Sequence, residues 1–271
     1  MKKLLLSLVI VTVILGSCKK DEETTTPTPT VTPYQITSAD IPVAGEQYRL
    51  AVYTVTPNDT FTVGASGQGR VWNYNPIPIT AQVDTFDFGS PANHPDGAFF
   101  TGSNLYLDSH QEAVMFMDKN SSKVDVTGIW VNANGEIMKG NMTDNYTVLK
   151  FPITYNAAYN DTGYASIATT INYQGVDLPG KYDIKFKVTS LCNAEGNITT
   201  PTGTYKCIRD KRREIQDMKV SVQVLGQWSE VYSQVDTNYT YTFWSKDKKW
   251  YVADVKTDVT DKIISISYLL E

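Results

Sequence analysis

Hydrophobic and polar residues alternate along much of the chain. In the segment "KYDIKFKVTSL", apolar residues occupy every second position, and charged residues or threonine occupy most of the positions between them. The segments "MKVSVQVL" and "IISISYLL" repeat this alternation. A period of two is typical of strands that bury one face, as in antiparallel sheets. In the first segment we expect one shared face for Tyr182, Ile184, Phe186 and Val188.

Further strands are predicted where valine, threonine and aromatic residues gather, because these residue types suit a pleated surface. Turn signals separate these segments at Asp118–Ser122, Asn134-Gly135, Pro179-Gly180 and Lys246–Lys248. No convincing amphipathic helix is found, so the chain is predicted to be all-β with almost no helix outside its N-terminal segment. The further strands are "QYRLAVYTVT", "ITAQVDTFDF", "AVMFMDK", "TGIWVNA", "TVLKFPITY", "YASIATTINY", "NYTYTFW" and "WYVADVKT".

The first 17 residues have the pattern of a bacterial signal peptide. Two lysines precede an apolar run, Leu4–Leu15, that is shorter than the roughly 20 residues of a spanning helix. The sequence Leu15-Gly16-Ser17-Cys18 resembles a lipobox, in which the cysteine is diacylated and becomes the first residue of the mature chain. Cys18 is therefore the predicted lipidation site, and the alternative is a secreted protein with a chance cysteine.

Residues 18–34 are predicted to address and tether the domain that follows. "CKKDEE" resembles the signal that displays Bacteroidota-type lipoproteins on the cell surface, and a solvated charge run is the alternative. "TTTPTPTVTP" favours an extended spacer. We expect an outer-membrane lipoprotein facing the cell surface, or alternatively the periplasm, with the membrane as a partner through its lipid anchor. Residues 35–271 are expected to form a single all-β domain, with a subdivision near 156–161 as the alternative.

Composition narrows the classes of partner only slightly. The chain has 271 residues, of which 41% are hydrophobic and 20% are charged, with a formal net charge of -5. These are ordinary values for a globular protein. The mild negative charge argues against a nucleic-acid partner, since such proteins usually carry a basic face.

Two cysteines remain in the body, Cys192 and Cys207. An exported protein meets an oxidising compartment, which favours a disulfide between them. The turn predicted at Thr200–Gly203 opposes direct pairing, because it would place Cys207 across from Gly196 instead of Cys192. The disulfide is expected if the segment around Cys192 folds back; otherwise two buried, inert thiols are expected.

The C-terminal part resembles a known group of proteins. "GNITTPTGTYKCIR" and the later "YTFWSKDKKWYVADVK" are similar to exported lipoprotein domains related to the lipoprotein-localisation-factor superfamily. The resemblance covers about the last 75 residues, with a weaker likeness at "GASGQGRVWNY". It implies a strongly curved antiparallel sheet, an unclosed barrel or a sandwich, often with a hydrophobic concavity. Cys207 departs from the arginine-rich strand of those domains.

No motif predicts a catalytic residue, a metal site or a cofactor. Asp84, Asp87, His94 and Asp96, with the second histidine His110, match no compact metal-ligand spacing and suit ordinary loops. "DKNSSKVDVTGI" begins like a calcium loop but lacks the required glycine and glutamate, which favours a hairpin. "GASGQG" is followed by no helix that could bind phosphate. The basic residues of "KCIRDKRRE" are expected on a solvated strand face or edge, with acidic glycans or lipid headgroups as the alternative.

The expected function is a non-catalytic binding module for an apolar or glycan ligand. Trp228, Trp244, Trp250 and Tyr251 could stack on sugars, although aromatic residues in an all-β protein are mainly core. The alternatives are a structural or accessory component of an outer-membrane assembly and, with less support, a glycan-active enzyme with paired carboxylates.

Overall fold

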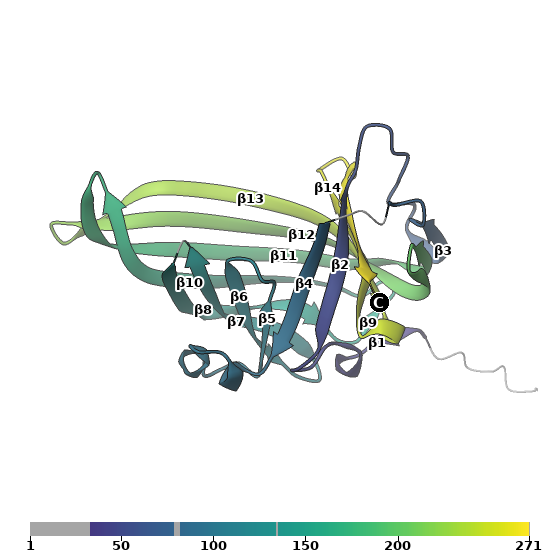
Figure 1. Ribbon diagram of the computed structural model, residues 1–271, viewed down its shortest axis with the longest axis horizontal. Helices are drawn as coiled ribbons and strands as arrows, with labels where there is room; N and C mark the ends of the chain where they lie inside the picture. Colours follow the sequence, from purple (N-terminus) through teal and green to yellow (C-terminus); the bar gives the residue numbers. More distant parts are fainter. Residues whose placement is uncertain (1–32, 79–81, 134, 271) are drawn as a thin grey trace, which may run out of the picture. The chain divides into compact units, whose positions relative to one another are not determined.

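Strands account for nearly all regular structure in the computed structural model, which describes residues 33–78, 82–133 and 135–270 (Figure 1). Four 3-10 helices of three residues each join the strands, and no α-helix is found in these ranges. The strands are β1 (Gln35–Ile36), β2 (Gln47–Thr54), β3 (Gly67–Asn73), β4 (Gln82–Gly89), β5 (Leu105–Asp108), β6 (Ala113–Lys119), β7 (Lys123–Ala133), β8 (Glu136–Lys150), β9 (Ile153–Thr154), β10 (Ala158–Tyr173), β11 (Val176–Thr200), β12 (Gly203–Val224), β13 (Gln227–Ser245), β14 (Trp250–Thr257) and β15 (Ile263–Leu270). The 3-10 helices are η1 (Ser38–Asp40), η2 (Pro91–Asn93), η3 (Gly97–Phe99) and η4 (Lys246–Lys248).

Twelve of these strands form a closed ring. The order is β10-β8-β7-β6-β5-β4-β2-β15-β14-β13-β12-β11, and β11 also pairs with β10, which joins the two ends. Every pairing within the ring is antiparallel, whereas β3 adds to β11 in parallel outside it. The predicted all-β antiparallel class is confirmed. The unclosed form implied by the resemblance is wrong here, because β11 is long enough to pair along both of its edges.

The four longest strands form a ribbon that continues past the shorter ones. β10, β11, β12 and β13 have 16, 25, 22 and 19 residues, whereas β2, β4, β14 and β15 have 8 each. Figure 1 shows β11, β12 and β13 side by side, reaching beyond the ends of the short strands. β14 pairs with β13 only from Tyr239 onward. Within the described structure, the edge of β13 over Gln227–Asn238 therefore faces no other strand.

Most of the predicted turns are found at the expected residues. Thr200 pairs with Gly203, so the expected two-residue loop forms, and Ala133 pairs with Glu136. Pro179-Gly180 is a wrong prediction, since both residues lie inside β11. Pro179 lies opposite Thr170 of β10, and β12 pairs with β11 only from Gly180 onward, so the missing N–H of Pro179 removes no bond from the β12 ladder.

A long loop covers the outer face of the ring. Trp72 packs against Phe243 of β13 with ring centroids 5.1 Å apart. The guanidinium of Arg209 lies between the rings of Trp72 and Tyr241, at 5.2 and 5.0 Å. Arg209 also donates to the carbonyl oxygens of Val63, Gly64 and Ala65. The glycine-rich "GASGQG" segment thus caps a buried arginine.

The two body cysteines lie on different rows of the sheet and are free and buried. Cys192 is across from Asp210, whereas Cys207 is across from Gly196, as the turn register predicted. The expected disulfide between Cys192 and Cys207 is therefore corrected. β11 stays paired with β12 up to the turn, apart from a bulge next to Cys192, and does not fold back.

This arrangement makes both thiols unreactive. Burial raises the pKa of the Cys207 thiol to about 12 and raises that of Cys192 as well. The native protein should resist alkylation at pH 8, and the denatured body should take up two alkyl groups without prior reduction. Mass spectrometry of both samples measures this. Loss of two hydrogens and no uptake after denaturation would show that a disulfide forms.

Candidate functional site

Two adjoining cavities lie inside the ring, with volumes of about 310 and 370 Å³. We name the first the tryptophan cavity, after Trp244 and Trp250 in its wall, and the second the methionine cavity, after Met138 and Met218. The two cavities have four lining residues in common, Met115, Val126, Tyr146 and Glu214. They therefore form one continuous interior site.

The short strands provide an apolar wall for this site. Period-two alternation sends every second side chain of β4 to β7 inward. Phe86 and Phe88 come from β4, and Met115 from β6. They line the tryptophan cavity together with Leu105, Leu107, Met117, Val124 and Val126. A wall of this composition suits alkyl or other apolar groups.

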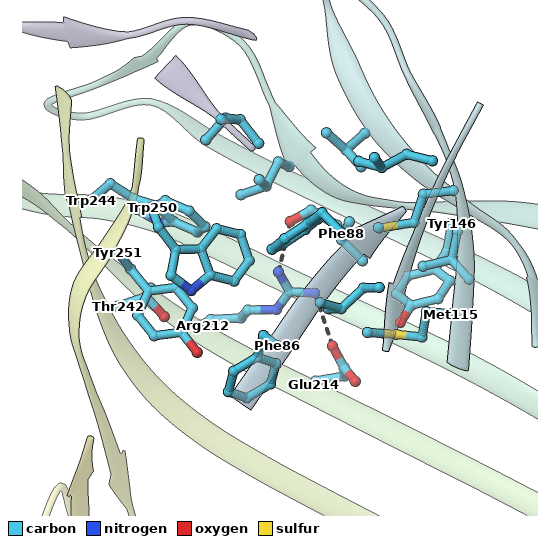
Figure 2. Close-up of a pocket in the computed structure, with 18 residues that line it drawn as sticks. Phe86, Phe88, Met115, Tyr146, Arg212, Glu214, Thr242, Trp244, Trp250 and Tyr251 are labelled. Carbon is cyan, nitrogen blue, oxygen red and sulfur yellow. Dashed lines mark hydrogen bonds and ion pairs between the residues drawn. The ribbon is translucent and has the colours of Figure 1, made fainter. Parts of the chain in front are cut away.

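The opposite wall carries the charged groups. Arg212 and Glu214 on β12 line the tryptophan cavity and form an ion pair with Nη2 and Oε2 2.9 Å apart. Arg212 Nη1 also donates to the Val148 carbonyl oxygen at 2.7 Å. Figure 2 shows the Arg212 guanidinium in the middle of the cavity, with Phe88 on one side and Glu214 on the other.

The local field keeps Arg212 charged. Burial is the largest single effect and lowers the pKa of Arg212, but Tyr159, Glu214 and two further neighbours together raise it above its usual value. Glu214 thus neutralises the guanidinium in a low-dielectric setting, where one partner alone would be costly.

Two more acids occupy the same wall. Asp210, Thr242 and Asp254 lie directly across from one another on β12, β13 and β14. Asp210 accepts from Ser190 Oγ at 2.7 Å, and Asp254 accepts from Thr242 Oγ1 at 2.6 Å. Burial raises the pKa of Asp254 to about 6 and also raises that of Asp210.

Two indole N–H groups of the tryptophan cavity have no protein partner. The side chains of Trp244 and Trp250 are 6% and 8% exposed. Trp250 packs against Tyr251 with ring centroids 4.6 Å apart, and Figure 2 shows it between Trp244 and Arg212. Among the described residues, no acceptor is in hydrogen-bonding geometry with either Nε1.

One end of the site is covered by the segment after β1. Ile41 is 3% exposed and lines the tryptophan cavity. Lys119 Nζ donates to the carbonyl oxygens of Ile41 and Pro42 at 2.7 and 2.9 Å, which fixes this cover to the end of β6. At the far end, half-buried residues of the ribbon, Tyr182 and Met218, line the methionine cavity.

The histidines and aspartates considered from the sequence are scattered. His110 Nε2 lies 2.6 Å from Asp87 Oδ2. His94 instead packs among the rings of Tyr106, Phe116 and Trp130. The remaining acids also have separate partners: Asp96 accepts from Trp130 and Lys139, and Asp84 accepts from Gln82. Within the described ranges, no group of three histidine, cysteine or acidic residues could hold a metal ion.

The basic residues of "KCIRDKRRE" do not all lie where they were predicted. A solvated face was predicted for the cluster, yet Arg209 is 1% exposed and Arg212 lies inside the ring. Of the others, Lys206 and Arg213 are exposed and Lys211 is half-buried. The alternation of Asp210, Arg212 and Glu214 was the missed signal, because it places acids and a base on one face of the strand.

The tryptophans considered from the sequence differ in burial. Trp244 and Trp250 are buried, and Trp228 near the tip of the ribbon is 48% exposed. Asp118–Ser122 forms the expected hairpin between β6 and β7 rather than a calcium loop. Cys18 lies outside the described residues, so its lipidation stays a prediction. No helix of the described part is long and apolar enough to cross a membrane.

Comparison with known proteins gives little further information. No protein-family model and no curated protein matches the chain. One solved structure with similarity is a Bacteroides fragilis protein described as exported and as having a YmcC-like fold. The two chains are 10% identical, the match covers 88% of this chain and 98% of the other, and the TM-score is 0.34. A similarity this low supports no conclusion about this protein.

The polar wall predicts a pH-dependent stability. Burial raises the pKa of Asp254 in the folded protein from its usual 3.8 to about 6, so the folded protein holds this proton more tightly. Its contribution is therefore greatest at low pH and is lost as pH rises from about 4 to 6. Asp254→Asn should raise the free energy of unfolding by about 1–3 kcal/mol at pH 7 and change it little at pH 4. Urea titrations of both proteins at both pH values measure the difference, and an equal effect at the two pH values would contradict it.

Proposed function

We propose that this protein is a non-catalytic binding module that holds an apolar or amphipathic ligand inside the ring. The supporting observation is the pair of adjoining cavities with a largely apolar lining. Their volumes fall in the range of small-molecule sites, and few polar groups converge on them, as in sites that fix one end of an apolar ligand. The lining favours an apolar ligand over a glycan, which would need more hydrogen-bonding groups.

The charged pair supports binding rather than catalysis. Arg212 and Glu214 satisfy each other, and the Arg212 guanidinium is held further by the Val148 carbonyl. A general acid or base is expected to be free to exchange a proton with its substrate. Their role in this proposal is to mark the polar end of the site.

Filling the site tests the proposal. Met115 lines both cavities and is half-buried, so Met115→Trp should occupy the space where they join. The probe is N-phenyl-1-naphthylamine, which fluoresces in apolar surroundings. Met115→Trp should reduce probe binding at least tenfold, whereas Val71→Trp, at a position 76% exposed, should leave it unchanged. Met115→Phe provides a smaller change if the tryptophan variant does not fold.

Probe binding that is equal in Met115→Trp, Met115→Phe and Val71→Trp would overturn the interior site. Absence of probe binding to the unmodified protein would do the same.

We further propose that the protein is a lipoprotein anchored through Cys18 in the outer membrane and facing the cell surface. The signal-like start and the sequence "LGSC" support the anchor, and "KKDEE" supports surface display. Cys18→Ala should release the protein from membranes or leave it unprocessed. Membrane retention of a fully processed Cys18→Ala protein would contradict the anchor.

A second candidate function, an accessory component of an outer-membrane assembly, is favoured by the ribbon. The unpaired edge of β13 carries no lysine, arginine or proline over Gln227–Asn238. Such residues commonly protect an edge strand from pairing with another chain. Co-purification of a stoichiometric protein partner that is lost when Val231 is replaced by proline, with probe binding intact, would support this role. Val231 lies at the bulge, where β12 makes no pair with it.

A further inference from the structure

We infer that the polar end of the ligand is an uncharged hydrogen-bond acceptor, such as an ester or ketone carbonyl, held in the tryptophan cavity. Its alkyl part would extend toward the methionine cavity. This inference rests on the proposed function and adds the chemical class of the ligand.

The two unpartnered indoles supply the donors. Trp244 and Trp250 line the same cavity, and both are more than nine-tenths buried. Trp244 Nε1 has no acceptor among the described residues, and Trp250 Nε1, beside Tyr251, has none in hydrogen-bonding geometry. A buried N–H without a partner destabilises the folded protein, and a ligand acceptor removes that cost. Indole N–H groups donate only, so they select for an acceptor and against an ammonium group.

The charges of the site disfavour an anionic head. Glu214 already pairs with Arg212, the one basic residue among the described residues that line the two cavities. Asp210 and Asp254 stand on the same wall, and the described lining of the two cavities offers no basic residue besides the paired Arg212. A carboxylate head would therefore be buried without a counter-ion in a low-dielectric interior, which is costly. A cationic head would have to separate Glu214 from Arg212, which would leave a buried charge unpaired.

The position of the donors sets the orientation. Trp244 lies near the end of β13, and Trp250 starts β14, at the end of the site that Ile41 covers. The methionine cavity lies on the other side of Glu214 and is lined by apolar residues such as Ile129, Met138 and Ile167. An amphipathic molecule would therefore enter with its polar end first and leave its chain beneath the ribbon.

Competition between matched ligands tests this class. The full chain, held in amphipol without free detergent, is loaded with N-phenyl-1-naphthylamine and titrated at pH 8 with methyl myristate, myristate, tetradecylamine and pentadecane. Methyl myristate should displace the probe at a concentration at least tenfold lower than myristate or tetradecylamine, because it carries an acceptor without a buried charge.

Removal of the indole donors separates hydrogen bonding from packing. Trp244→Phe and Trp250→Phe should each weaken the binding of methyl myristate roughly fivefold. Each should change the binding of pentadecane by less than about twofold. Trp228→Phe, which removes an indole that lines neither cavity, is the matched control and should leave the binding of both ligands unchanged. If either phenylalanine variant unfolds, the same comparison with the other variant remains.

The outcomes distinguish the inference from the proposed function. If no ligand displaces the probe, or the probe itself does not bind, the interior site is wrong. If all four ligands bind but myristate or tetradecylamine displaces the probe at the same concentration as methyl myristate, the interior site stands and the inference of an uncharged head is wrong. If the phenylalanine variants weaken the binding of methyl myristate and of pentadecane equally, the role of the indole donors is also overturned.

Discussion

Strand β11 pairs along both of its edges, and this double pairing closes the sheet into a ring with an enclosed interior. One edge pairs with β12 from Gly180 to Thr200, and the other pairs first with β10 and then with β3. The change of partner falls at a bulge next to Cys192, and the extra residue, Asn193, accepts a hydrogen bond from Arg209 Nε. Without the β10 pairing the sheet would have two free ends and its interior would be open to water.

Closure also explains the distribution of charge. Once the sheet is a ring, alternate residues of β12 must face either the covering loop or the interior. Arg209 is satisfied by loop carbonyls on the outer side, and Arg212 is satisfied by Glu214 on the inner side. A buried ion pair contributes little net stability but is costly to break. The pair of Arg212 and Glu214 is therefore expected to stay formed as a polar group within the apolar interior. The interior is thus apolar on one wall and self-neutralised on the other.

Much of the fold could be predicted from local patterns, because alternation and turn chemistry act over a few residues. "AVMFMDK", "WYVADVKT" and "IISISYLL" match β6, β14 and β15 to the residue, and the Thr200–Gly203 turn sets the register of Cys207. Closure could not be predicted, because the ring also requires β2 to pair with β15, a strand that is distant in sequence. Pro179-Gly180 misled because its turn preference is local, whereas pairing with β10 holds both residues inside β11.

The candidate site was less predictable than the fold. The general rule that aromatic residues of an all-β protein are mainly core holds for Trp244 and Trp250, but no local signal indicates that their N–H groups lack partners. The alternation of Asp210, Arg212 and Glu214 was visible, yet a mixed-charge strand face is normally solvated. Burial of that face follows only from the ring.

We propose that the ring holds an apolar or amphipathic ligand in the cell. Native mass spectrometry of the protein purified from the cells that make it, with lipid extraction of the same sample, tests this proposal. We expect a native population heavier than the denatured chain by the mass of one small apolar molecule, and we expect Met115→Trp to lack this extra mass. A single unliganded mass for both proteins, with no apolar molecule in the extract, would contradict it.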